Sequence, residues 1–379
     1  MSESSGPPVV DIVIPVHSQD RPLGRAVDSA IAATRGMGPA DCGIMVVAHH
    51  ISARQVESML SEEQLMRVTI VECSDPGTTP AGPRNTALER TAAPFISFLD
   101  SDDTLDPGAV DRWLSIAQTR GSDWVLPFQH HSDGRADMTP ITRPWRSSDL
   151  SAVADRLFYR SSAFGLIRVA TARAAGARFD TDVITAEEQA FILRLHTHAR
   201  RIDYARGIPG LLVHADATDR VSRVPIPVGD QALPALRLSE TEWFAQAPPA
   251  LQAGFFLKFI RVNIFPFIEL HVKNESWDRA QAQSAYDSIQ SLLRAAPLSK
   301  NQLSRADSRV IELLSNPDTE PARLAQALAA RRRFASPAAL ATPRLSWLLA
   351  RNAPLRISAA GVVQILRHKW GGRRGSAAG

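Results

Sequence analysis

Cysteine is scarce in this sequence: Cys42 and Cys73 are the only two in 379 residues. Both lie in or beside apolar runs typical of strands, so the sequence predicts no disulfide framework and suits a reducing compartment. The first eight residues are polar and lack the apolar segment of a secretory leader. No apolar run reaches the length of a membrane span, because the stretch 253–270 is interrupted by Lys258 and Arg261. We therefore expect a cytoplasmic protein.

Acidic residues are absent from the last part of the chain. Of the 43 Lys and Arg residues, eleven lie in 321–379, which contains no Asp or Glu. The other 32 share residues 1–320 with all 39 acidic residues. An acidic body therefore carries a basic tail, and this asymmetry predicts an anionic partner for the tail.

Two apolar segments, 345–349 and 357–366, lie within this basic tail and are flanked by arginines at 331–333 and 367–374. Segments of this kind lie on anionic membrane surfaces, where each nearby basic residue adds about 1 kcal/mol. The pattern favours a peripheral position at the inner face of a membrane, and the alternative is a basic surface on a packed helical bundle. No nucleic acid partner is expected, because no reading motif accompanies the charge.

Strand-like and helix-like segments alternate along the first third of the chain. Amphipathic helical segments lie between apolar runs typical of strands, at 9–16, 43–48, 68–73, 95–99 and 124–128. This order predicts an α/β fold with a Rossmann-like, mostly parallel sheet and helices on both faces.

The pattern changes after these strands. Short strands are expected at 163–169, 202–205 and 211–214, with a helix at 187–198, and 224–227 is typical of a linker. Beyond it we expect only helices, the later ones at about 278–295, 301–315, 320–334 and 356–370. The prediction is an α/β domain over 1–225 and an all-α domain over 226–379.

Three carboxylates follow the strand at 95–99 within four residues: Asp100, Asp102 and Asp103. Asp100 and Asp102 are two apart, so in an extended backbone they point the same way and can approach one hard cation such as Mg²⁺ or Mn²⁺. The carboxyl edge of a parallel sheet is also where ligands bind. The alternative is a solvated acidic turn in which Asp106 caps the next helix.

Three local patterns occur in a fixed order. They are Ile12-Val13-Ile14-Pro15-Val16-His17 before a helix at 23–33, then Gly82-Pro83-Arg84-Asn85, then Ile96-Ser97-Phe98-Leu99-Asp100-Ser101-Asp102-Asp103 before Leu105-Asp106-Pro107-Gly108. Together they resemble the family 2 glycosyltransferases of the GT-A fold, across residues 9–222. The resemblance implies a nucleotide-sugar donor, in the first place a UDP-sugar, and an inverting transfer. The acceptor would be a glycan or a polyol-phosphate, in cell-surface glycan or wall-polymer synthesis.

The resemblance also implies a Mn²⁺ or Mg²⁺ ion, which would stabilise the charge of the leaving nucleoside diphosphate. Asp102 would be the direct ligand, and Asp100 would face the ribose or join the metal site. His214, which ends a strand, would complete that site or touch the diphosphate; a polar cap is the equally weighted alternative. The implied donor-binding residues are Pro15, Val16, His17, Arg84, Asn85, Asp100 and Asp102.

The general base of this family belongs to an acidic pair that opens a helix after the acceptor-binding segment. Glu187-Glu188 matches that place, where the family usually has Glu-Asp. Glu188 takes the position of the base and is one methylene longer, with Glu187 as its partner. The alternative is that both acids merely suit a helix N-terminus.

One departure from the family concerns the turn after the second strand. The family commonly has acidic residues there that hold the nucleoside, whereas this chain has His49 and His50. A histidine can stack on or hydrogen-bond a base, although a solvated loop also explains the pair. Arg84 suits the nucleoside or its phosphates, because its planar guanidinium can bind either one. A surface salt bridge is the alternative role.

Two other classes of function compete with this prediction. The lost acidic turn favours a donor-binding or scaffolding protein without turnover. A nucleotidyltransferase also uses metal-binding carboxylates on an α/β sheet, but the Gly-rich phosphate loop near the first strand is missing. The residues identify neither the sugar nor the acceptor.

Overall fold

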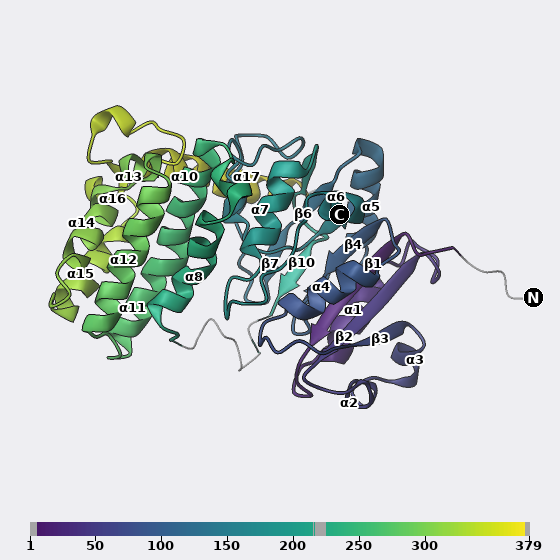
Figure 1. Ribbon diagram of the computed structural model, residues 1–379. Helices are drawn as coiled ribbons and strands as arrows, with labels where there is room; N and C mark the ends of the chain where they lie inside the picture. The colour runs from purple at the N-terminus through teal and green to yellow at the C-terminus, as the bar shows by residue number, and fades with distance from the viewer. Residues whose placement is uncertain (1–5, 215, 217–224, 376–379) are drawn as a thin grey trace, which may run out of the picture.

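The protein has two regions, an α/β region and a helical region, which lie side by side (Figure 1). The computed structural model describes residues 6–214, 216 and 225–375, with side chains up to residue 367. The α/β region is coloured purple to teal and the helical region green to yellow. The fold class predicted from the sequence is confirmed: a mostly parallel sheet covered by helices, followed by helices only.

A seven-stranded sheet forms the centre of the α/β region. Its order is β3-β2-β1-β4-β8-β6-β9, and all neighbours are parallel except where β8 pairs with β4 and β6. The bounds are β1 (Val10–Val16), β2 (Cys42–His49), β3 (Val68–Cys73), β4 (Phe95–Phe98), β6 (Trp124–Pro127), β8 (Leu166–Arg168) and β9 (Ile202–Ala205).

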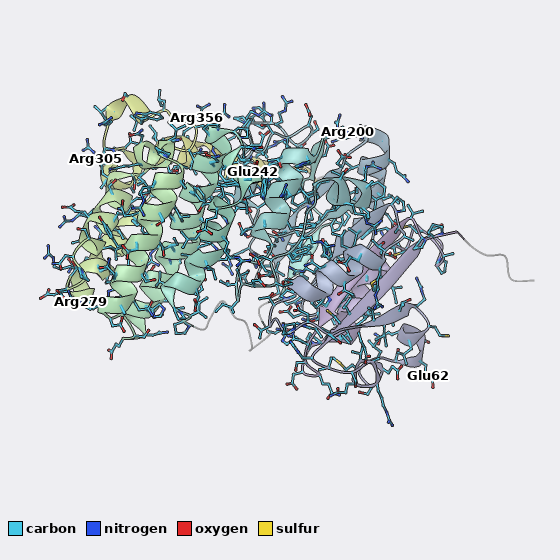
Figure 2. All side chains as sticks on the ribbon, in the orientation of Figure 1. Glu62, Arg200, Glu242, Arg279, Arg305 and Arg356 are labelled. Atoms are coloured by element: carbon cyan, nitrogen blue, oxygen red, sulfur yellow. The ribbon has the colours of Figure 1, made fainter. Side chains whose placement is uncertain are left out.

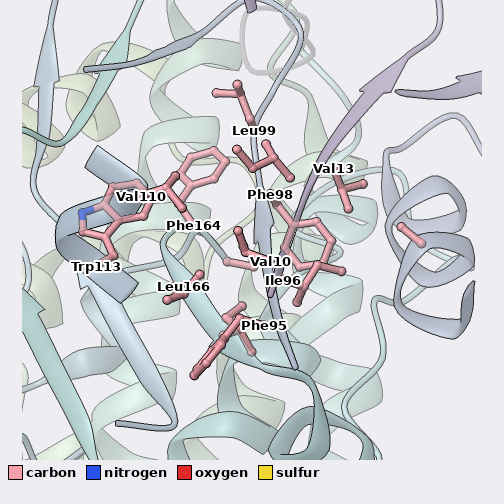
Figure 3. Close-up of a cluster of buried hydrophobic side chains, with 14 of the residues drawn as sticks. Val10, Val13, Phe95, Ile96, Phe98, Leu99, Val110, Trp113, Phe164 and Leu166 are labelled. Carbon is pink, nitrogen blue, oxygen red and sulfur yellow. The ribbon is translucent and has the colours of Figure 1, made fainter. Parts of the chain in front are cut away.

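The central position of β1 follows from its composition. All seven of its residues are buried, because β1 has a partner strand on each side and helices on both faces. Figure 3 shows part of the resulting core, with Val10 and Val13 from β1 and Phe95, Ile96 and Phe98 from β4. This packing fixes where both strands end, and the site lies at those ends.

Most helices of the α/β region bury part of their surface. In α1 (Leu23–Ala33) the buried residues follow helical spacing, and Ser52 caps α2 (Ala53–Glu57) with a reciprocal bond to Gln55, as predicted for Ser52. The remaining helices are α3 (Glu62–Leu65), α4 (Ala81–Arg90), α5 (Ala109–Arg120), η1 (Leu157–Tyr159), α6 (Val169–Ala174) and α7 (Gln189–His198).

A second sheet of three short strands, which the sequence did not predict as a unit, covers one end of the site. It consists of β5 (Thr104–Leu105), β10 (Leu211–Val213) and β7 (Gln129–His131). The alternative in which Asp106 caps the next helix is wrong on that point. Gly108, at φ 76°, precedes α5, and the Asp106 carboxylate instead contacts the His130 ring and accepts from the Gly210 amide.

The helical region has its own apolar core, to which the α/β region contributes Phe158 and Leu193. The predicted division at 225/226 remains a prediction. It adjoins residues 217–224, which lie outside the described residues and include Val224, the first residue of the predicted linker. The helices are α8 (Val228–Ser239), α9 (Glu242–Ala245), α10 (Pro249–Lys258), η3 (Phe259–Ile264), α11 (Phe265–Lys273), α12 (Arg279–Ala295), α13 (Leu298–Gln302), α14 (Arg305–Leu314), α15 (Pro321–Arg331), α16 (Pro337–Leu340), η4 (Leu345–Trp347) and α17 (Pro354–Gly375).

One continuous helix, 249–273, runs through α10, η3 and α11. By length and composition it is long enough and apolar enough to cross a membrane, and 67% of its most apolar window is buried inside the protein. The expectation that Lys258 and Arg261 interrupt this run is wrong, because the apolar helix continues through both residues; Lys258 is buried, and Arg261 is mostly buried beside Asp307. This burial explains why the helix is so apolar: it forms the core of the helical region.

The part of the basic segment 321–379 that the structure describes packs against the rest of the protein and is not a separate tail. Leu324 and Leu328 of α15 are buried in the helical core, and Arg331 pairs with Asp307 of α14 at 2.7 Å. Farther along, Gln364 of α17 donates to Thr142 of the α/β region at 2.7 Å. The segment therefore packs on both regions of the molecule.

Candidate active site

A cavity of about 500 Å³ lies at the carboxyl ends of β1, β2 and β4. This is the edge at which an α/β sheet binds ligands, because the strand order turns there and the loops diverge. Most of the residues predicted for the site line this one cavity: Pro15, Val16, His17, Arg84, Asp100, Asp102, Glu187 and Glu188.

The three carboxylates after β4 lie in a turn. The backbone N–H of Asp103 donates to the carbonyl of Asp100 at 3.1 Å, so the backbone is not extended there as expected. The turn nevertheless gathers one oxygen from each of Asp100, Asp102 and Asp103 within 4.8 Å of one another. Asp103 thus joins the pair that the sequence predicted.

These carboxylates fit a hard divalent cation. An all-oxygen set of carboxylates is what Mg²⁺ and Mn²⁺ prefer, and the repulsion among three close negative charges requires positive charge nearby. Two arginines contribute to it: Arg21 lies 3.1 Å from Asp102, and Arg84 lies 2.7 Å from Asp100.

His214 lies beside this turn, immediately after β10. Its backbone N–H donates to Asp103 at 2.9 Å, and its ring Nε2 lies 2.9 Å from the Thr104 hydroxyl. The small sheet causes this proximity, because β10 pairs with β5, which follows the acidic turn. The predicted role of His214 toward a metal remains a prediction.

Arg84 connects the two acidic parts of the cavity. It is buried on α4, which excludes the surface salt bridge considered as its alternative. Its guanidinium contacts Asp100 at 2.7 Å, Glu188 at 2.9 Å and Glu187 at 3.3 Å. Burial opposes its charge, but the three carboxylates raise the pKa of Arg84 above its usual range.

Glu187 and Glu188 immediately precede α7. Neither side chain caps the helix, and both point to Arg84, so helix-end electrostatics alone does not explain the pair. One guanidinium cannot balance three carboxylates in a buried site. Burial, the neighbouring Glu187 and then Asp100 accordingly raise the pKa of Glu188 to about 8, with Arg84 opposing the shift. Burial also raises the pKa of Glu187.

Asn85 does not line the cavity. Its side-chain amide donates to the Phe179 carbonyl at 2.9 Å and accepts from the Phe179 N–H at 3.0 Å. These two hydrogen bonds between side chain and backbone connect α4 to the segment that leads to the acidic pair.

His49 lines the cavity at the end of β2. Its ring contacts the Asp75 carbonyl at 3.2 Å and packs at a tilted angle against the ring of His50, whose own Nε2 lies 2.7 Å from the Gly77 carbonyl. Burial and then His50 lower the pKa of His49, so the ring is neutral at pH 7. The solvated-loop alternative does not describe His49, which is buried.

Two residues at or behind the site, Arg21 and Lys258, were not predicted as site residues, and Asp103 was noted without a role. Asp103 was visible in the acidic motif, but Arg21 follows β1 in a segment without a pattern. Lys258 comes from α10 of the helical region, where it hydrogen-bonds Gln189, the residue after Glu188, at 3.1 Å. Only the tertiary structure brings it to the site.

No family model matches the chain. Among curated proteins, it is 24% identical over 197 residues to a poly(ribitol-phosphate) beta-glucosyltransferase of Bacillus spizizenii, covering 51% of this chain and 30% of that protein. It is 21% identical to the poly(ribitol-phosphate) beta-N-acetylglucosaminyltransferase TarP of Staphylococcus aureus, covering 48% and 56%. The chain thus spans only 30% to 56% of the length of these relatives.

Among solved structures, S. aureus TarS 1–349 has a TM-score of 0.65 and 14% identity, over 86% of this chain and 91% of that chain. The same TarS fragment is also known in complex with UDP-GlcNAc, again with a TM-score of 0.65. The resemblance to the family 2 glycosyltransferases is thereby confirmed, and the chain has their GT-A fold.

Proposed function

We propose that this protein is a metal-dependent, inverting glycosyltransferase that moves a sugar from a nucleotide-sugar donor to a hydroxyl acceptor. One observation carries the proposal: the acidic turn and the Glu187–Glu188 pair face the same cavity, and Arg84 contacts both. A site for the leaving diphosphate and a group that accepts a proton are thus available to one bound donor.

The metal side of the site consists of Asp100, Asp102 and Asp103, which would hold Mn²⁺ or Mg²⁺. A bound cation would stabilise the negative charge of the leaving nucleoside diphosphate. Arg84 and Arg21 add fixed positive charge beside the same carboxylates. A leaving group stabilised in this way needs no proton from an acid.

Glu188 is the proposed base. In an inverting transfer the acceptor hydroxyl attacks the face opposite the leaving group and loses its proton to a nearby carboxylate. The raised pKa of Glu188 suits this task, because a base of that strength holds a proton well and still ionises near neutral pH. Glu187 is the proposed partner that shares Arg84 with it.

The proposed donor is a UDP-sugar, and the proposed acceptor is a polyol-phosphate, with another glycan as the alternative. The relatives named above act on poly(ribitol-phosphate), and TarS binds UDP and UDP-GlcNAc. His49, neutral and facing the cavity, is the proposed contact of the nucleobase in place of the acidic turn. The proposed pathway is cell-surface glycan or wall-polymer synthesis.

We also propose a cytoplasmic location with peripheral contact to an anionic membrane. Six large apolar side chains are exposed on α17 and on the segments around Trp145 and Leu345–Leu349 that contact it, and we name this set the basic–apolar face: Trp145, Leu345, Leu349, Val362, Ile365 and Leu366. Exposed residues recur every third position along α17 (Arg356, Ala359, Val362 and Ile365), which makes a stripe that winds gradually around the helix.

Contacts between arginines and these segments hold the basic–apolar face together. Arg367 lies 5.4 Å from the Trp145 ring centre, and Arg356 donates to the Leu349 carbonyl at 3.3 Å. Figure 2 labels Arg356 at the edge of the molecule, close to the junction of the two regions. Positive charge around exposed apolar side chains complements an anionic bilayer.

Nucleotide sugars mixed with the purified protein and Mn²⁺ test the proposed enzyme. Slow release of nucleoside diphosphate, accelerated by a polyol-phosphate acceptor, is expected for one donor of a UDP- and GDP-sugar panel. Binding of that donor without turnover under any acceptor would instead favour the donor-binding protein. Release of pyrophosphate would indicate nucleotidyl transfer.

A further inference from the structure

Lys258 is a buried cation without a carboxylate partner at hydrogen-bond distance. It ends α10 and has no accessible surface. Its ammonium donates to the side-chain carbonyls of Gln189 at 3.1 Å and Asn263 at 3.2 Å, both of them neutral groups. Among the residues that the structure describes, no carboxylate forms an ion pair with it. Such an ammonium costs far more to bury than a methionine of similar length.

A π-helical turn makes this arrangement possible. In η3, which begins immediately after Lys258, the backbone bonds connect residues five apart. The wider turn brings Asn263 to the side of the helix that carries Lys258, whereas in a regular α-helix residues five apart diverge. Single π turns within α-helices are frequent at functional sites.

Gln189 links Lys258 to the acidic pair. It is the first residue of α7 and follows Glu188 directly. Its side-chain carbonyl accepts from Lys258, and its amide nitrogen lies 3.4 Å from the Ser161 carbonyl, to which it donates. The Gln189 side chain is therefore fixed at both ends, and it fixes the start of α7 at the position of Glu188.

The charges around Glu188 give Lys258 a second effect. The titratable groups that face Glu188 are Glu187 beside it, Arg84 from α4, Asp100 from the acidic turn and Lys258 from α10. Burial lowers the pKa of Lys258 to about 7, and Glu188 opposes that shift. By the same coupling a charged Lys258 favours the ionised form of Glu188, because each charge stabilises the other.

We propose that Lys258 is a positioning residue for Glu188: through Gln189 it fixes the start of α7, and its charge favours the carboxylate form of the base. This inference rests on the proposed role of Glu188 as the base of the transfer. It also gives the helical region a task in the reaction, since the ammonium behind the base belongs to α10.

Replacement of Lys258 by methionine tests the charge. We expect K258M to lower kcat while the KM for the donor stays unchanged, because Lys258 does not line the cavity. The acid limb of the kcat profile should move to higher pH, and a rise of one pKa unit lowers the ionised fraction about tenfold below that pKa. K258Q, which keeps a hydrogen-bonding group but no charge, should show the same shift. K273M, an exposed lysine on the same helix, is the control.

Folding and chemistry are separable in this test. Loss of a lone buried charge should leave the melting temperature of K258M equal to or above that of wild type. An unchanged pH profile in a folded K258M overturns the inference. Absence of donor turnover in the wild-type protein instead overturns the proposed function and leaves the coupling to be measured directly.

A double-mutant cycle measures that coupling without catalysis. The denaturation midpoints of wild type, K258M, E188Q and the double variant are compared at pH 7.5. Non-additive shifts are expected, because Lys258 contacts Gln189 beside Glu188 and its proton binding is coupled to that of Glu188. Additive shifts overturn the inference, whatever the activity of the protein.

Discussion

Two buried charge clusters, one in each region, have opposite balances. In the α/β region Arg84 faces the carboxylates of Asp100, Glu187 and Glu188, so negative charge is in excess. In the helical region Asp307 lies between Arg261 at 2.9 Å and Arg331 at 2.7 Å, so positive charge is in excess.

The physical consequences of the two balances differ. Burial opposes the charge of Asp307, but its two arginines hold the pKa of that carboxyl well below its usual range. Asp307 also accepts from the backbone N–H of Ser304, the N-cap of α14, and thereby completes a capping box, so its lone pairs are used within the fold. The Arg84 cluster instead has carboxylates with raised pKa values that face a cavity. The comparison teaches that surplus charge facing open space indicates a ligand site, whereas a closed, satisfied cluster indicates structure.

The largest effect is expected from D102N. The change keeps the shape of the side chain and removes one negative charge from the proposed cation site, so donor turnover in Mn²⁺ should fall to background and donor affinity should drop. Nucleoside diphosphate release and calorimetric binding measure the two effects. D287N, at an exposed position on α12, is the control. Wild-type turnover in D102N would remove Asp102 from the site.

The next largest effect is expected from E188Q, which is nearly isosteric but cannot accept a proton. A general base contributes about 10²–10⁴-fold, so transfer should fall by that order while donor binding stays close to normal. Single-turnover transfer and donor titration separate the two quantities. If E187Q is crippled and E188Q is active, the roles of the two glutamates are reversed.

The helical cluster should respond in stability and not in chemistry. D307N leaves two buried arginines without their counter-charge and should lower the free energy of unfolding by about 3 kcal/mol. Urea denaturation measures this loss, and transfer per folded molecule should be unchanged. E312Q, which breaks an exposed pair with Arg309, should cost less than about 1 kcal/mol. Loss of transfer in a folded D307N would contradict the comparison, because the helical cluster would then also contribute to the reaction.

The raised pKa of Glu188 also predicts a pH dependence of stability. The pKa of Glu188 is about 8 in the folded protein against an ordinary value of 4.5, so the folded state binds more protons between these pH values. Stability from this group therefore falls as pH rises from about 4.5 to 8. Denaturation midpoints at pH 5 and pH 8 should differ less in E188Q than in wild type. E62Q, an exposed control, should behave as wild type.

The smallest effect concerns the basic–apolar face. Serine at Val362, Ile365 and Leu366 should weaken cosedimentation with phosphatidylglycerol vesicles about tenfold or more, while donor turnover in solution stays intact. Rising salt should release the wild-type protein, because charges are screened within about 8 Å at physiological ionic strength. M66S, at an exposed position far along the sequence, is the control. Failure of wild type to bind at low salt contradicts the proposal.

Truncation at residue 321 is not a suitable test of membrane binding. It would remove Leu324 and Leu328 from the helical core and Arg331 from Asp307. Point changes in exposed side chains keep this packing intact.

Local signals in the sequence were sufficient for the main sheet. The strands β1 to β4 and the helix α12 lie within one or two residues of their predicted bounds, because buried runs and helical periodicity extend over many residues. The small sheet escaped prediction, since strands of two or three residues, such as β5 and β10, carry no period. The same holds for the turn at Asp100–Asp103, where a single hydrogen bond replaces the expected extended backbone.

The candidate site was predictable where its residues form motifs and not where they meet only in space. Asp100, Asp102 and Glu188 come from recognisable patterns and do line one cavity. Lys258 lies 70 residues after Glu188 in an aromatic helix, so no local pattern connects the two. Asn85 belongs to a motif, yet its amide is used within the fold.

The bonds of Asn85 to Phe179 have a consequence for binding kinetics. They join the helix that carries Arg84 to the segment that leads to Glu188, so two hydrogen bonds connect the two sides of the cavity before a donor binds. A donor entering the cavity then reorients side chains without having to assemble the backbone around it. Binding should therefore proceed in a single fast phase, with little ordering entropy to lose on the protein side.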